Sequence, residues 1–145
     1  MPNISGSFSG TTNSQTVVFL KDAPGHQLSL GEIVGVQESP VPLWDGSSLT
    51  YWSTVDLLSG QGTQRGYYVN AHTNGDRDWG TFEGKVTSVG SEVTLQGTFA
   101  FSGGSGTLSG VTGGGTYIGR MTSPTEVEMA WEGTYELGEA KAQTA

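Results

Sequence analysis

Polar and apolar side chains alternate along much of this chain with a period of two residues. In the C-terminal half the tripeptide Gly-Thr-aromatic recurs at residues 80–82, 97–99, 115–117 and 133–135, at intervals of 17 or 18 residues. One strand and one turn fill such an interval, whereas helical and heptad periods do not fit it. The pattern therefore predicts an antiparallel meander.

The glycine and the aromatic residue of each repeat point to the same face of their strand, because successive strand side chains point to opposite faces. That face is apolar throughout, while the opposite face carries Thr, Glu, Lys and Arg. Small and large side chains alternate on the inward face of small closed barrels. We therefore expect the apolar face to line a lumen and to bind a substrate there, through Phe82, Phe99, Tyr117, Met129, Trp131 and Tyr135.

The N-terminal half also reads as strands. Residues 3–9 and 15–20 are expected to form a hairpin around a polar turn at 11–14, followed by strands near 26–37, 49–58 and 63–71. No segment has the period of an amphipathic helix. The sequence predicts one all-β domain at residues 1–137, a single antiparallel β-barrel of eight or nine strands that is calycin-like in outline. A polar tail at 138–145 is expected to be disordered.

The composition of the chain argues against several classes of partner and cofactor. The 145 residues include 6 Lys and Arg against 14 Asp and Glu, a net charge of −8, and no cysteine. Without a basic stripe, nucleic acid and membrane surfaces are not expected partners. His26 and His72 lack paired-ligand spacing, so no metal site is expected, and without a nucleotide fingerprint no cofactor is expected. An N-terminus without an apolar signal segment predicts a cytoplasmic protein.

Glu32 is the first candidate for chemistry. It shares a strand face with Leu28, Leu30, Val34 and Val36. If that face lines the lumen, burial raises the pKa of the Glu32 carboxyl and suits it to move protons. Two alternatives remain: an inert glutamate hydrogen-bonded near a barrel mouth, or a strand turned by one residue, which places Glu32 outside.

Tyr68 and Asn70 are the next candidates, because they share a face with Gln64 on the strand at 63–71. A phenol and a carboxamide that face an apolar cavity can polarise a substrate oxygen. They can equally be core polar groups bonded to each other. Tyr51 is expected to be a wall of the lumen.

Two connections carry further expectations. The loop at 38–48 is rich in proline but holds Leu43 and Trp44, so we expect it to cover one mouth of the barrel and to let Trp44 gate the entry of a ligand. Arg77 lies between Asp76 and Asp78, which predicts an exposed turn with an ion pair of little energetic weight.

The C-terminal third resembles a known family. A glycine-rich turn between two strands, continuing to Trp131 and Tyr135, is similar to a turn of allene oxide cyclases and the related dirigent proteins; here it is Gly103, Gly104, Ser105, Gly106, Leu108 and Gly110. The resemblance implies an eight-stranded barrel, often trimeric in those families. It also implies a cavity that binds a hydrophobic molecule and steers its cyclisation or coupling without a cofactor. Glu32 and Asn70 would be analogous to the family's glutamate and asparagine.

Three functions follow from these expectations. The first is a cofactor-free isomerase or cyclase that acts on a hydrophobic small molecule, with Glu32, Tyr68 and Asn70 as catalytic residues. The second is a lipocalin-like or avidin-like binding protein without turnover, and the third is a structural protein whose own side chains fill the lumen. An outward Glu32 would favour the last two. A homo-oligomer, trimer or dimer, is compatible with all three.

Overall fold

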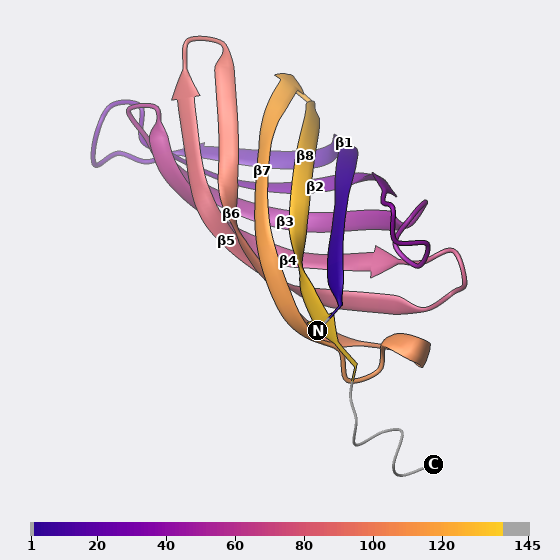
Figure 1. Cartoon of the computed structure of the whole chain (residues 1–145). Coiled ribbons are helices and arrows are strands. Elements are labelled where there is room, and N and C mark those ends of the chain that lie inside the picture. The colour runs from indigo at the N-terminus through magenta and orange to yellow at the C-terminus, as the bar shows by residue number, and fades with distance from the viewer. Residues whose placement is uncertain (1, 138–145) are drawn as a thin grey trace.

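A computed structural model describes residues 2–137, so the tail expected at 138–145 lies outside the described residues. Eight antiparallel strands in sequence order close into a barrel (Figure 1), which confirms the predicted fold class. The only described helical element is a single 3₁₀ turn, η1 (Gly106–Leu108). The strands are β1 (Asn3–Phe19), β2 (Gln27–Glu38), β3 (Ser48–Leu58), β4 (Gln61–Ala71), β5 (Arg77–Val89), β6 (Glu92–Gly104), β7 (Thr112–Ser123) and β8 (Glu126–Glu136).

The barrel is flattened into two layers whose strands cross at a steep angle, as in orthogonal sheet packing (Figure 1). Strand β1 belongs to both layers: Asn3–Thr11 pairs with β8, and Ser7–Phe19 pairs with β2. The hairpin expected from residues 3–20 is therefore wrong. The segment at 11–14 holds a register shift between Thr12 and Ser14, and such a bulge bends a strand without reversing it.

The interior side of the repeat region is confirmed. Phe82 lies opposite Phe99, and Tyr117 lies opposite both Gly97 and Trp131. A Cβ atom on Gly97 would lie 2.7 Å from the Tyr117 hydroxyl, so the glycine leaves room for the ring of its neighbour. The core is completed by the buried side chains of Phe8, Ile33, Tyr51, Tyr68, Val86, Leu95 and Val127.

Strand β2 faces the opposite way from the prediction. Ile33 and Gln37 are buried, whereas Leu28, Leu30, Val34 and Val36 lie on the outer surface. The physical reason is Phe8, which is fully buried and whose ring occupies the space beside Gly10 and Gly35. A larger residue at position 35 on the inward face of β2 would displace that ring.

Replacing Gly35 by Ala should therefore destabilise the barrel. The added Cβ would collide with the backbone oxygen of Ser9 and lie 2.7 Å from the Phe8 ring. Overpacking of this kind costs about 1 to 3 kcal/mol. Gly31→Ala is the matched control on the same strand, because its Cβ meets nothing closer than 3.5 Å. Urea unfolding of both variants measures the difference in the free energy of unfolding. Equal losses in the two variants would mean that the packing of Phe8 does not require a glycine at position 35.

Candidate functional site

The lumen contains a small cavity, of about 90 Å³. Ligand sites for drug-sized molecules are usually about 300 to 1,000 Å³. Aromatic rings from seven strands, β1 and β3–β8, and from the β2–β3 loop form most of its wall, and a few polar groups interrupt them. Its lining includes Phe8, Gln37, Trp44, Tyr51, Gln64, Tyr68, Asn70, Asp78, Phe82, Phe99, Phe101, Tyr117, Met129 and Trp131.

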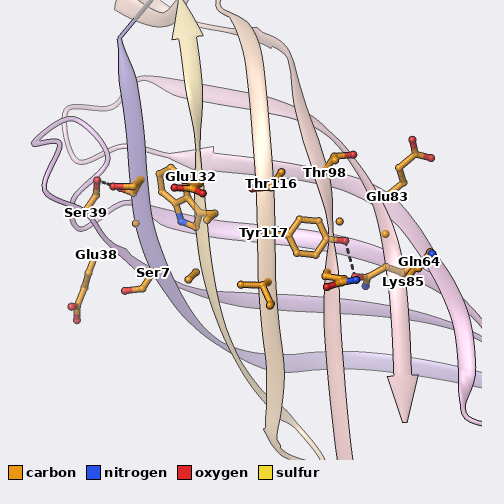
Figure 2. Close-up of a pocket in the computed structure, with 18 of the residues that line it drawn as sticks. Ser7, Glu38, Ser39, Gln64, Glu83, Lys85, Thr98, Thr116, Tyr117 and Glu132 are labelled. Carbon is orange, nitrogen blue, oxygen red and sulfur yellow. Dashed lines mark hydrogen bonds between the residues drawn. The ribbon is translucent and has the colours of Figure 1, made fainter.

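A larger hollow of about 1390 Å³ lies over the outer surface of β4–β8 and β1 (Figure 2). Its outer wall consists of exposed Ser, Thr, Glu, Lys and Arg side chains such as Thr98, Glu83 and Lys85. Water can satisfy all of these groups, so none of them requires a ligand. The figure also shows the Tyr117 hydroxyl directed at Gln64 Oε1, a hydrogen bond of 2.8 Å that keeps this phenol occupied.

Trp44 closes the end of the barrel where the β2–β3, β4–β5 and β6–β7 connections meet. Its side chain is 2% exposed and packs against His72, Phe101 and Tyr135 with ring centroids 5.0 to 6.2 Å apart. Leu108 and Val111 complete the same cluster. The expected cover over one mouth is present. In this conformation Trp44 is part of a packed core.

A chain of hydrogen bonds connects side chains of the cavity wall and ends at Asp78. Trp131 Nε1 donates to Gln37 Oε1 at 2.6 Å, and Gln37 Nε2 donates to Asn70 Oδ1 at 3.3 Å. Asn70 Nδ2 then donates to Asp78 Oδ1 at 3.2 Å. The chain brings together residues from four strands and points its last donor at a carboxyl group that is 1% exposed.

His72 completes this buried cluster and shares a proton with Asp78. Its Nδ1 donates to the backbone oxygen of Leu43 at 2.7 Å, because a carbonyl can only accept. Its Nε2 lies 2.5 Å from Asp78 Oδ1, so one proton lies between these two atoms. Burial lowers the pKa of His72, but the hydrogen bonds to Asp78 and Leu43 outweigh burial and raise it overall. The favoured state is an imidazolium paired with a carboxylate.

Two buried polar atoms of the cavity wall have no hydrogen-bond partner in the described protein: Asp78 Oδ2 and the Tyr68 hydroxyl. Burial, and then the nearby charge of Asp78, raise the pKa of Tyr68 well above its usual value, so the phenol keeps its proton and can donate it to a hydrogen bond. Such orphaned groups are rare in folded proteins. The cavity therefore presents one acceptor and one donor that need a partner.

The placement expected for Glu32 is wrong. The turned β2 strand puts Glu32 on the outer face, where Asn13 Nδ2 donates to it at 2.8 Å and Trp52 Nε1 at 2.9 Å. These two hydrogen bonds lower the pKa of Glu32, the opposite of the expected shift. The outward position and the lowered pKa of Glu32 remove the reason for assigning it a proton-transfer role. Tyr68, Asn70 and Gln64 do lie inside together, as expected.

Asp78 and His72 are the residues that the sequence reading missed. The exposed ion-pair turn expected around Arg77 is wrong for Asp78, which points inward and lies opposite Asn70. The sequence held the information needed to place Asp78. Two-residue spacing puts Asp78 on the same strand face as Gly80 and Phe82, which were both predicted to face the lumen. Among residues 2–137 no group of three His, Cys, Asp or Glu side chains is placed to hold a metal ion.

No known protein family matches the chain, and no curated protein matches it either. The likeness to allene oxide cyclases and dirigent proteins therefore remains a resemblance in one turn and its flanking strands. No helix within residues 2–137 is long and apolar enough to span a membrane.

The His72–Asp78 pair should make the barrel less stable as the pH rises. Because the folded-state pKa of His72 is raised, its stabilisation is fully present below the unfolded value of about 6.5 and is lost as the pH passes the folded value. The loss of unfolding free energy caused by His72→Gln should therefore be larger at about pH 6 than at about pH 9.

His26→Gln is the control for this pH dependence. His26 also has a raised pKa, caused by Asp56 first and Asp22 second, but its partners lie on the surface. Exposed ion pairs contribute little and are screened by salt. The effect of His26→Gln should be small and should vanish at high salt. A His72→Gln effect that does not change with pH would contradict the proton-sharing pair.

Proposed function

We propose that the barrel binds a small, mainly apolar molecule in its lumen, through one polar group held between Tyr68 and Asp78. The observation that carries this proposal is the pair of buried, unpartnered atoms, the Tyr68 hydroxyl and Asp78 Oδ2, in the wall of an aromatic cavity. Leaving a buried polar group unpaired costs about 1 to 3 kcal/mol. A ligand that pairs with both atoms recovers this cost on binding.

A hydroxyl group fits the two atoms best. Asp78 Oδ1 is already occupied by His72 and Asn70, which leaves Oδ2 to accept a hydrogen. Tyr68 offers a hydrogen. A hydroxyl oxygen donates one hydrogen and accepts another, whereas a carbonyl can only accept. The preferred ligand class is therefore an alcohol or a phenol with an apolar body.

The cavity must expand to hold such a ligand. An engineered cavity of about 150 Å³ in a protein core binds benzene, and the lumen offers about 90 Å³. Trp44 is the side chain that both lines the cavity and closes the end of the barrel. A shift of Trp44 would add volume beside Asp78 without breaking a strand.

A second candidate is cofactor-free isomerisation, favoured by the asymmetric carboxylate of Asp78. One oxygen is bonded to His72 and Asn70, and the other has no partner in a residue that lines the cavity. Asp78 Oδ2 would take a proton from the carbon next to a ketone, while the Tyr68 hydroxyl donates to the carbonyl oxygen. In a β,γ-unsaturated ketone the resulting enolate is a dienolate, and the same carboxyl would return the proton to its far carbon, so that the double bond moves into conjugation with the ketone and no atom is gained or lost.

Phenol should bind more tightly than toluene, which replaces the hydroxyl by a methyl group on the same ring. Calorimetry should show the preference in the wild type, and Tyr68→Phe should weaken phenol binding by roughly fivefold, the loss of one hydrogen bond. In the ligand-free protein the same substitution should raise the unfolding free energy, because it removes an unpaired buried hydroxyl.

Tyr117→Phe is the matched control for this experiment. It removes a hydroxyl from the same cavity, but one that is bonded to Gln64. It should lower the unfolding free energy and leave the preference for phenol over toluene intact. Equal binding of phenol and toluene by the wild type would contradict the proposed function.

The isomerase candidate has its own test, the exchange of hydrogen next to the carbonyl of cyclohexanone in D₂O, followed by mass spectrometry. Asp78→Asn should slow protein-dependent exchange by about 100-fold. Glu32→Gln changes a carboxyl on the outer face and should leave the rate unchanged. Exchange no faster than in buffer alone would leave a binding protein without turnover.

A further inference from the structure

The second half of β1 is a free strand edge. Pairing with β8 ends at Thr11, and the Thr12 nitrogen donates to the Thr125 oxygen at 2.7 Å. Beyond that point, among the described strands, only β2 pairs with Ser14–Phe19. Backbone N–H and C=O groups on the side of β1 away from β2 therefore have no strand to bond. In Figure 1 this segment runs across one end of the barrel, beyond the bend of β1.

The free edge has none of the features that normally prevent strands from joining. Residues 15–19 are Gln-Thr-Val-Val-Phe, without charge, proline or glycine. Val17, Val18 and Phe19 are 41%, 50% and 67% exposed. Proteins usually protect such edges with lysine, proline or a covering loop, and an uncharged β-branched edge is a template for a further strand.

We infer that this edge pairs with the same edge of a second copy of the chain, antiparallel and about a two-fold axis. An isologous contact of this kind needs a patch that is complementary to itself. A register centred on Val17 places Val17 of one copy opposite Val17 of the other, and Gln15 opposite Phe19. No like charges meet along the paired segment. On β2, Leu28 and Leu30 extend the apolar surface beside the edge.

Charge at the two ends of the segment supports a second copy. Lys21 follows the end of β1 at Phe19, so the same two-fold arrangement brings Lys21 of each copy toward the bulge at Asn13 of the other. There the Asn13 amide already holds the Glu32 carboxylate at 2.8 Å. Lys21 thus approaches an opposite charge at both ends of the contact. Asp22, the neighbour of Lys21, is already bonded to His26 at 2.8 Å. The complementarity arises from one chain and is satisfied by its own copy.

This contact is separate from the lumen site. The edge and the β1–β2 connection lie at one end of β2, and the loop that carries Trp44 follows the other end. Dimer formation and ligand binding are therefore expected to respond to different substitutions.

Disulfide trapping tests the register directly, because the chain has no cysteine of its own. Opposite residues in an antiparallel pair have Cα atoms about 4.5 to 5.5 Å apart, within the range of about 4.4 to 6.8 Å that a disulfide spans. Val17→Cys should form a cross-linked dimer on mild oxidation. Val89→Cys is the control, because Val89 is 70% exposed but lies on the β5–β6 hairpin. Cross-linking of Val17→Cys no faster than of Val89→Cys would overturn the proposal.

Sedimentation of the uncross-linked protein provides the second measurement. The wild type should dimerise, and Val17→Lys should weaken the dimer by roughly tenfold or more, because it sets two lysines opposite each other. Val89→Lys should leave the dimer unchanged. A wild type that stays monomeric would mean that the edge pairs with a strand of another protein. A Val17→Lys variant that dimerises normally would place the dimer contact elsewhere. Either result overturns the proposal.

Discussion

The space inside the barrel is the constraint on which the rest of the structure depends. Eight strands enclose an interior that side chains can fill, and this chain fills it with aromatic rings. Several of these rings need a glycine beside them: Gly97 for Tyr117, and Gly10 and Gly35 for Phe8. Part of the glycine content of the chain is a consequence of this packing, and glycines with positive φ in the turns account for another part. The same constraint leaves about 90 Å³ of the interior unfilled.

The side chains that face the lumen could be predicted where the Gly-Thr-aromatic tripeptide repeats, but not in β2, which lacks this repeat. The Gly-Thr-aromatic repeats gave the correct inward face for β5–β8, because a bulky ring has few places other than the interior. In β2 both faces hold aliphatic residues, so the alternation alone did not distinguish them. The deciding contact is Phe8 against Gly35, a pairing between distant segments that no local pattern reveals.

Prediction of the candidate site also required contacts between segments that are distant in the sequence. Tyr68 and Asn70 were predicted to lie inside, because they follow a Gly-x-aromatic pattern. Asp78 was assigned to an exposed turn, because charged residues beside Arg77 usually belong to solvent. Only the arrangement of the strands shows that His72, Asn70 and Asp78 converge. Such a convergence lets a buried carboxylate exist, since its charge is compensated by an imidazolium and an amide.

The remaining question is whether this polar cluster serves the barrel or a ligand. A lumen that only had to be filled would gain stability from phenylalanine at position 68, where the hydroxyl has no partner. It would also gain from replacing the buried ion pair of His72 and Asp78 by apolar residues of similar size, a change that is often neutral or stabilising in proteins. The cluster retains both of these unfavourable features, and the two residues with unpaired atoms line the small cavity in the lumen. The packing of the side chains alone leaves both atoms unpaired, whereas a bound polar group would pair with both.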